Sequence, residues 1–287
     1  MNGPPGGPSL EPWRFGALTL DWGQPVLMAI LNATPDSFSD GGRLDSLEAG
    51  VALARAQIEA GAHILDIGGE STRPGAQPVS VETECDRVLP LIRALRGGPA
   101  ILSIDTSKAE VAAAALDAGA HLVNDVTGLG DPEMAGVVAN ARAALCVMHM
   151  RGEPRTMQSG EIHYDDLVGQ IGSALKASAE RAVSAGVPAQ RILVDPGIGF
   201  GKTLEHNLEL TRSLGVFARL GYPVLYGPSR KRFLGAITGR EVHDRDRATA
   251  AACVAGWLYG ARAFRVHDTA ACTDALRVAS ALRPVPV

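Results

Sequence analysis

Polar residues in this sequence gather at the carboxyl ends of strand-like apolar runs. Eight such runs end in a polar or glycine-containing group, at Asn32, 66–73, 105–106, 124–125, 149–151, 195–202, 229–231 and 265–268. A polar side chain inside an apolar strand costs free energy unless it finds a partner. Because the carboxyl ends of parallel strands meet on one face of a barrel, these groups indicate a ligand pocket on that face.

The charges of these groups indicate what the pocket binds. Four of the side chains are cationic or become so on protonation: Arg73, Lys231, Arg265 and His267. Asn32 adds a neutral oxygen ligand. Together they suit an anion such as pyrophosphate, bound with Mg²⁺.

A second subsite is indicated deeper in the strands. Asp105, Asn124 and Asp195 supply hydrogen-bond acceptors and one amide. This set suits a flat heterocycle with adjacent N–H donors, such as an aminopyrimidinone. Asp66 has two interpretations, as a ligand contact or as a brace of the barrel. Asn124 and Asp125 point to opposite faces of their strand, so only one of them faces the lumen.

Other polar segments have weaker interpretations. Residues 32–42 and 68–78 are long for strand-to-helix connections and are candidate lids over the barrel mouth. Residues 195–202 (DPGIGFGK) lack the spacing of a Walker loop. His149 is interpreted as a satisfied core histidine. Residues 244–247 (DRDR) are interpreted as a solvated, self-paired helix start.

A regular alternation of strand-like runs and helical patterns carries these residues. The expected strands are 26–33, 64–69, 100–106, 122–128, 143–150, 192–198, 223–229 and 263–268. The expected helices are 44–60, 81–95, 108–118, 132–140, 164–185, 204–220, 247–259 and 270–282. Continuous apolar strands are typical of a parallel sheet buried on both faces. Eight strand–helix pairs favour an α/β fold closed into a (β/α)₈ TIM barrel over an open doubly wound sheet.

Length and composition set further limits. The 287 residues accommodate one barrel of about 250 residues. We expect a disordered Gly/Pro-rich tail at 1–12 and one barrel domain at 13–287. Within that domain, 15–20 and 24–27 are expected to form a short N-terminal β-hairpin that plugs the bottom of the barrel.

Charge, hydropathy and cysteine usage exclude several classes of protein. The net charge of −4 lacks the basic excess of nucleic-acid-binding proteins. No uncharged apolar run reaches the roughly 18 residues of a membrane span. The four cysteines lie far apart and are expected to be reduced, which favours the cytoplasm. Of the basic residues, 23 are arginine and only four are lysine, so each lysine is informative.

The motifs together resemble one known family. Eight pieces occur in the order NATPDSFSDGG, DIGGESTRPGA, SIDTSK, VNDVTG, VMHMRGEPRTMQ, DPGIGFGKTLEHN, GPSRKRFLG and RVHD. This ordered set resembles the dihydropteroate synthases of folate synthesis. The resemblance implies a (β/α)₈ barrel, Mg²⁺ as cofactor, a homodimer and inhibition by sulfonamides. The implied reaction joins (7,8-dihydropterin-6-yl)methyl diphosphate to 4-aminobenzoate, giving 7,8-dihydropteroate and diphosphate.

The resemblance also implies a role for each matching residue. The implied pterin contacts are Thr72, Asp105, Asn124, Asp195 and Lys231. The implied diphosphate contacts are Arg265 and His267, and the implied Mg²⁺ ligand is Asn32. The implied wall of the 4-aminobenzoate site is Phe38, Arg73, Pro74 and Ser229, with Asp40 as a further loop participant. The implied catalytic residues are Asp105, Lys231, Arg265 and His267.

Two other interpretations remain open. A pterin-binding methyltransferase barrel shares the Asp and Asn residues of the pterin edge but acts with a cobalamin partner. The groups at 72–74, 229–231 and 265–267 favour pyrophosphate chemistry instead. A catalytically silent paralogue would bind pterin without turnover, although the complete set of cations favours an active enzyme.

Overall fold

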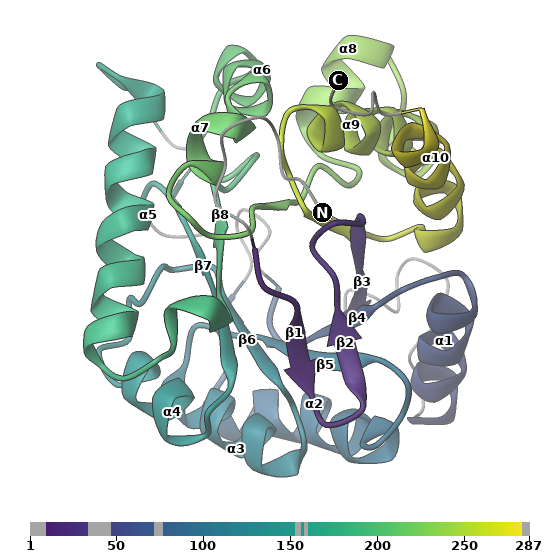
Figure 1. The fold of residues 1–287 in the computed structure, drawn as a ribbon, viewed down its shortest axis with the longest axis vertical. Helices are drawn as coiled ribbons and strands as arrows, with labels where there is room; N and C mark the ends of the chain where they lie inside the picture. Colours follow the sequence, from purple (N-terminus) through teal and green to yellow (C-terminus); the bar gives the residue numbers. More distant parts are fainter. Residues whose placement is uncertain (1–9, 34–46, 72–76, 153–155, 158–159, 283–287) are drawn as a thin grey trace.

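The computed structural model of the chain (Figure 1) describes residues 10–33, 47–71, 77–152, 156–157 and 160–282. Several residues with expected roles lie outside these ranges: Phe38, Asp40, Thr72, Arg73 and Pro74. The expected tail at 1–12 lies mostly outside them as well. The remaining expected site residues all lie within the described part of the chain.

Eight parallel strands form the main sheet, in the order β8-β7-β6-β5-β4-β3-β10-β9. They are β3 (Val26–Asn32), β4 (Ile64–Gly68), β5 (Ile101–Asp105), β6 (Leu122–Asp125), β7 (Ala144–Met148), β8 (Ile192–Asp195), β9 (Leu225–Tyr226) and β10 (Ala263–Val266). A parallel bridge joins Val194 of β8 to Val224, next to β9. The Val194 amide donates to the Pro223 carbonyl at 3.1 Å. The two edge strands therefore meet, which confirms the barrel and excludes the open sheet.

Helices surround the strands, as Figure 1 shows. They are α1 (Leu47–Glu59), α2 (Val81–Leu95), α3 (Ala109–Ala118), α4 (Met134–Asn140), α5 (Leu167–Ser184), α6 (Leu204–Arg212), α7 (Leu214–Ala218), α8 (Arg232–Thr238), α9 (Asp246–Leu258) and α10 (Thr269–Ala281), with short 3₁₀ turns η2 (Ala189–Arg191) and η3 (Val242–Asp244). Ser80, Asp166, Thr203 and Asp268 cap α2, α5, α6 and α10 with their side-chain oxygens.

Several expected elements differ from the observed ones: the strands expected at 122–128 and 192–198 end at Asp125 and Asp195, and α8 was not expected. Two further differences have a clear physical reason. The expected helix 204–220 is divided at Ser213, which takes a non-helical conformation between α6 and α7. The expected strand 223–229 shortens to the two residues of β9. Pro223 and Pro228 flank that strand and have no N–H to donate to a ladder.

Strand side chains divide between two apolar cores. Outward-facing residues such as Leu65, Leu102 and Leu145 pack against the helices in the larger core. Inward-facing residues near the strand starts, such as Met28 and Ile101, form a smaller core inside the barrel. The lower lumen is therefore filled with side chains, and only its upper end is left for ligands.

An N-terminal hairpin closes the bottom of the barrel. Strand β1 (Trp13–Phe15) pairs with β2 (Leu18–Leu20), so the hairpin is confirmed but its expected pairing of 15–20 with 24–27 is wrong. Gly16 takes a φ of +58° between the two strands, which allows the tighter turn. Trp13 and Trp22 meet edge to face with ring centroids 4.9 Å apart, and both belong to the inner core.

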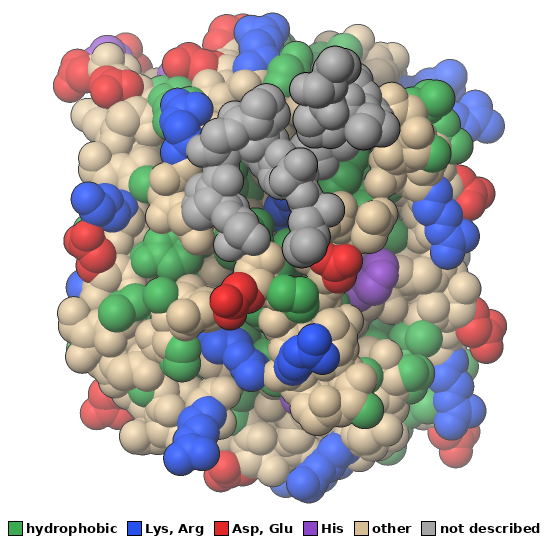
Figure 2. All heavy atoms as spheres, viewed as in Figure 1, with side chains coloured by type: hydrophobic (Ala, Val, Ile, Leu, Met, Phe, Trp, Pro, Cys, Tyr) green, Lys and Arg blue, Asp and Glu red, His purple; other side chains and the backbone are tan. Residues whose placement is uncertain are grey.

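Charges of both signs are interspersed over the face shown in Figure 2, in keeping with the small net charge. In the described ranges, no helix is long and apolar enough to span a bilayer. The four cysteines are free, and Cys146, Cys253 and Cys272 are buried.

The hairpin plug generates a stability prediction at Trp22. Its ring is 2% exposed, and among the described residues its indole N–H has no hydrogen-bond partner. We expect Trp22→Ala to lower the free energy of unfolding by about 3–5 kcal/mol. Trp22→Phe should cost far less, because a phenyl ring still fills most of the space and no hydrogen bond is lost. Urea denaturation measures both, and equal costs for the two variants would contradict this packing.

Candidate active site

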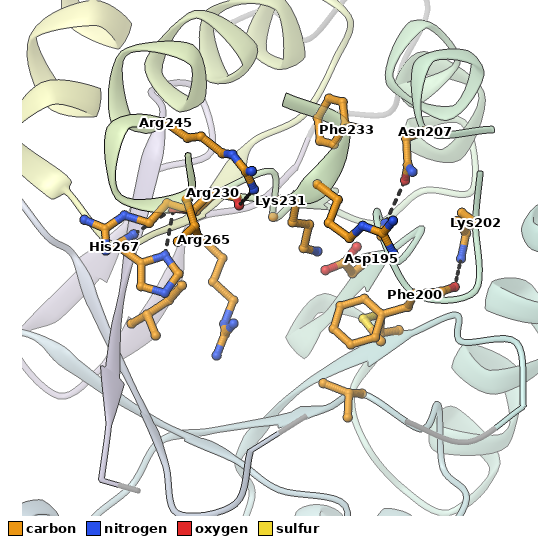
Figure 3. A pocket seen from close by; sticks show the side chains of 18 of the residues that line it. Asp195, Phe200, Lys202, Asn207, Arg230, Lys231, Phe233, Arg245, Arg265 and His267 are labelled. Carbon is orange, nitrogen blue, oxygen red and sulfur yellow. Dashed lines mark hydrogen bonds between the residues drawn. The ribbon is translucent and has the colours of Figure 1, made fainter. Parts of the chain in front are cut away.

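A cavity of about 1160 Å³ opens at the carboxyl ends of the strands. Its lining includes Asn32, Asp105, Asn124, Asp195, Ser229, Lys231, Arg265 and His267. All eight expected site residues that the structure describes are therefore brought together. Figure 3 shows Lys231 reaching towards Asp195, with Phe200 beside them.

Asp66 is the brace of the barrel floor. Its carboxylate is fully buried and accepts hydrogen bonds from three other strands. Ser103 Oγ donates to Oδ1 at 2.6 Å. Asn124 Nδ2 and Arg265 Nε donate to Oδ2 at 3.1 and 2.6 Å. The structure thus selects the bracing interpretation of Asp66.

Asp105 lines the cavity and carries one unpaired acceptor oxygen. Arg265 Nη2 donates to Asp105 Oδ2 at 2.6 Å. The buried Oδ1 has no hydrogen-bond partner among the described residues. Burial raises the pKa of Asp105 to about 7, against the attraction of Arg265 and with added repulsion from Asp66. An unsatisfied buried acceptor is costly, so this oxygen is suited to a ligand N–H donor.

Arg265 remains protonated in this environment. Burial lowers its pKa, but Asp66 and Asp105 raise it more, so the pKa lies above its ordinary value. The guanidinium therefore joins two carboxylates at the floor.

Asn124 and Asp125 diverge as expected from strand alternation. Asn124 faces the lumen and Asp66. Asp125 accepts from the Thr127 amide and hydroxyl at 2.8 and 2.6 Å, and from the Leu129 amide at 2.7 Å. Asp125 therefore organises the connection after β6, and Asn124 is the cavity residue.

Lys231 occupies a narrow space beside Asp195. Its Nζ donates to the Ile198 carbonyl and lies 4.5 Å from the Phe200 ring centroid. Burial lowers the pKa of Lys231 to about 8, and Asp195 opposes this. A Cβ atom on Gly199 would lie 2.9 Å from Lys231 Cδ. This close fit favours a slender lysine over a planar guanidinium.

The segment after β8 is shaped by glycine and side-chain anchors. Gly197 has φ +70°, and its amide donates to Asp195 Oδ1 at 2.7 Å. A Cβ at Gly197 would lie 1.9 Å from the His149 carbonyl oxygen. The Gly199 amide donates to Asn207 Oδ1 at 2.7 Å. Burial raises the pKa of Asp195, against the attraction of Lys231.

Ser229 and His267 form a pair at the rim. Ser229 Oγ lies 2.9 Å from His267 Nδ1 and accepts from the His267 amide at 3.1 Å. From α1, Gln57 Nε2 donates to the His267 carbonyl at 3.1 Å. The contact at Nδ1 orients the imidazole, and the other two fix the main chain of His267.

Asn32 ends β3 at the same rim and is half-buried. In the described ranges, no group of three or more His, Cys, Asp or Glu residues is placed to hold a metal ion. Mg²⁺ commonly takes only one or two protein oxygens and completes its shell with water and substrate phosphates. Among the described residues, the donors would suit such an ion at Asn32 and form no cage of protein ligands.

Lys202 is a buried residue that the sequence interpretation missed. Its Nζ contacts the Phe200 carbonyl at 2.9 Å, and the carbonyl and Nδ1 of His149 at 3.3 and 3.2 Å. Burial lowers the pKa of Lys202 to about 7. Burial and Lys202 lower the pKa of His149 to about 4. His149 has the polar partner that its interpretation as a satisfied histidine expects, but it is half-buried just after β7 rather than in the core. The scarcity of lysine is the signal that could have drawn attention to this position, although it does not show what the side chain contacts.

A second group that the sequence did not predict is an ion-paired cluster beside the connection from β4 to α2. Lys108 Nζ donates to Glu70 and, at 2.6 Å, to Glu84. Glu70 also accepts from the Val79 amide at 3.2 Å. This group ties both ends of the connection to α2 and α3.

The DRDR segment is more than a solvated helix start. Asp246 pairs with Arg230 through two contacts of 2.8 Å. Arg245 Nη1 donates to the Arg230 carbonyl at 3.1 Å. The self-paired interpretation is therefore wrong for these two residues, because their partner lies 15 or 16 positions earlier.

Comparison with known proteins agrees with this geometry. Residues 28–267 match the family described as pterin binding enzyme. The chain belongs to that family. It is 46% identical over 275 residues to the dihydropteroate synthase of Synechocystis sp., covering 94% of this chain and 95% of the relative. It is 41% identical over 264 residues to that of Escherichia coli, covering 92% and 93%.

Solved structures of the family have the same fold. Dihydropteroate synthase of Yersinia pestis, in a complex with a sulfonamide drug, gives a TM-score of 0.90 at 40% identity, covering 94% of this chain and 98% of that one. The Xanthomonas albilineans enzyme with 4-aminobenzoic acid gives 0.87 at 44%, covering 93% and 96%. The same enzyme with 7,8-dihydropteroate gives 0.84 at 42%, covering 94% and 98%.

The buried carboxyl group of Asp105 generates a pH prediction. Its pKa rises from 3.8 to about 7 on folding, so the folded protein binds more protons than the unfolded chain between these values. The stability it contributes is complete below about pH 4 and is lost as pH rises through about 7.

We expect the difference in unfolding free energy between wild type and Asp105→Asn to fall over this window and to level off above it. Urea titrations from about pH 5 to about pH 8.5 measure this difference. A difference that grows with pH would show that the attraction of Arg265 outweighs burial.

Proposed function

We propose that this pterin-binding protein is an active dihydropteroate synthase. It joins (7,8-dihydropterin-6-yl)methyl diphosphate to 4-aminobenzoate and releases 7,8-dihydropteroate and diphosphate. One observation carries the proposal. One cavity is lined by buried Asp105 and Asp195, the first with an unpaired carboxylate oxygen, and by the cationic residues Lys231 and Arg265 together with His267. The ligands of the Yersinia pestis and Xanthomonas albilineans relatives support the same substrates and sulfonamide inhibitors.

The floor of the cavity suits the pterin ring. Asp195 and Asn124 face the aminopyrimidinone edge, whose N–H groups need acceptors. Asp105 Oδ1 accepts a further N–H, and Lys231 Nζ donates to a ring acceptor. The contact at Asp105 Oδ1 pairs a ligand N–H with an acceptor that has no other partner among the described residues.

The rim of the cavity suits the leaving group. The C–O bond between the pterin methylene and the diphosphate breaks, and the oxygen keeps its electron pair. His267 at the rim and the guanidinium of Arg265, which extends from the floor, stabilise the charge that develops on the leaving group. The methylene meanwhile becomes electron-poor, and the nearby carboxylate of Asp105 stabilises that positive charge.

The 4-aminobenzoate nitrogen then forms the new C–N bond and releases one proton. An arylamine is already neutral at pH 7, so the step needs positioning more than a strong base. Ser229 lies at the rim where this second substrate enters. The expected wall residues Phe38, Arg73 and Pro74, together with Thr72, belong to segments outside the described residues.

Asn32 is the residue that would hold Mg²⁺ at the diphosphate. When bound, the ion would neutralise charge on the leaving group. One neutral ligand from the described residues suits an ion that arrives with the substrate.

A coupled assay for diphosphate tests the proposal. We expect release to require both substrates and to fall when a sulfonamide competes with 4-aminobenzoate. Pterin binding without diphosphate release would identify a silent paralogue. Methyl transfer to a cobalamin partner would identify the methyltransferase alternative.

We also propose a homodimer in the cytoplasm. The free cysteines suit a reducing compartment. Leu258, Tyr259, Val278 and Leu282 lie exposed on α9, on α10 or just beyond their ends, and a second copy would cover them. Sedimentation should give a dimer for the wild type and a monomer for Val278→Glu. A monomeric wild type would contradict the proposal.

The narrow site of Lys231 generates a prediction for activity. We expect Lys231→Arg to lower kcat/KM by about 100-fold although charge is kept, because the guanidinium displaces the pterin. Lys176→Arg is the matched control, since Lys176 is exposed on α5. Near-normal turnover by Lys231→Arg would contradict the role of a slender donor.

A further inference from the structure

The turn from β9 to α8 contains an unusual backbone conformation. Lys231 N donates to the Pro228 carbonyl at 3.2 Å, so Ser229 and Arg230 are the two central residues of the turn. Arg230 has a φ of +56°. Glycine or asparagine normally occupies such a position, because other side chains crowd the backbone there. Arginine stays in this conformation only if its surroundings hold it.

Three residues at the start of α9 hold Arg230 from both sides. Asp246 binds its guanidinium with Nε–Oδ1 and Nη2–Oδ2 distances of 2.8 Å. Thr249 Oγ1 accepts from the Arg230 amide at 3.1 Å. Arg245 Nη1 donates to the Arg230 carbonyl at 3.1 Å, as Figure 3 shows. Side chain, amide and carbonyl of Arg230 are thus all fixed by one segment, here called the α9 bracket (Arg245, Asp246 and Thr249).

The conformation of Arg230 sets both of its neighbours in the cavity. Ser229, on one side, contacts His267. Lys231, on the other, begins α8 and reaches the Ile198 carbonyl. A rotation of φ at Arg230 to the common negative region would turn the chain between Ser229 and Lys231. The two cavity residues would then no longer lie together.

We propose that the α9 bracket is a positioning device for the pterin site. It holds Arg230 in the left-handed conformation and thereby places Lys231 and Ser229 against the substrate. The inference rests on the proposed function, because turnover is its main readout. Arg230 also lines the cavity, so a direct contact of its guanidinium with the substrate is the competing explanation.

Two substitutions at Arg230 separate these explanations. Arg230→Gly and Arg230→Ala both remove the guanidinium, but only glycine takes a positive φ without strain. We expect Arg230→Gly to keep kcat/KM about tenfold above that of Arg230→Ala, since the left-handed conformation is costly for alanine. The difference should appear as a higher KM for the pterin diphosphate. Asp244→Ala, an exposed change in the same segment, is the control and should match wild type.

A second comparison remains if Arg230→Ala fails to fold, as judged by circular dichroism. We expect Asp246→Asn to raise the KM for the pterin diphosphate about tenfold in the wild-type background. It should have little effect in the Arg230→Gly background, where no strained residue is left to hold. If Asp246 had only a general structural role, Asp246→Asn would raise the KM equally in the wild-type and Arg230→Gly backgrounds.

Equal decreases of kcat/KM in Arg230→Gly and Arg230→Ala would overturn the proposal in favour of a direct contact between the guanidinium and the substrate. No loss in either variant, or equal effects of Asp246→Asn in both backgrounds, would overturn it as well. Binding of 7,8-dihydropteroate by calorimetry, measured in parallel, should follow the same order of variants. A wild type that binds this ligand but releases no diphosphate contradicts the proposed function alone. The positioning role is then tested by the affinities of the variants, which should be higher for Arg230→Gly than for Arg230→Ala.

Discussion

The buried ion pair between Asp66 and Arg265 is the interaction on which the site depends. Asp66 comes from β4, Arg265 from β10, and the other two donors, Ser103 and Asn124, come from β5 and β6. A buried carboxylate is tolerated only with such partners. The same guanidinium then holds Asp105 by one oxygen and leaves the other open. Four strands are thereby joined at the level where the ligand site begins.

Below this level the barrel is filled with apolar side chains. Above it lies the cavity, which is lined by many polar side chains. Met28, Ile101 and the two tryptophans of the hairpin region fill the lower lumen. This packing excludes water beneath the ion pair, so the side of the ion pair that faces the lower lumen lies in a medium of low polarity. The raised pKa of Asp105 and the lowered pKa of Lys231 have the same cause, which is burial. Fold stability and site chemistry therefore depend on the same lower core.

The sequence predicted the barrel and much of the cavity because both follow from short-range patterns. A polar residue that ends a parallel strand, as Asn32 and Asp195 do, reaches the upper rim whatever the exact register. The bracing role of Asp66 could not be predicted, because the sequence does not show which side chains of other strands lie beside it. Lys202 contacts main-chain carbonyl groups, and Asp246 binds a residue in a left-handed turn. The sequence shows neither the path of the main chain nor its dihedral angles. The hairpin pairing failed for a similar reason, because it depended on the φ of Gly16.

The glycines after β8 have a consequence for inhibitor design. Gly199 and Phe200 line the cavity, and they are carried by Gly197 and Gly201, both at positive φ. A Cβ at Gly197 would strike the His149 carbonyl, and one at Gly201 would lie 2.6 Å from Arg151 Cβ. A drug that presses against this wall meets main-chain atoms held in place by neighbours on both sides. Resistance by a single substitution at Gly197 or Gly201 would distort the same wall that the substrate needs.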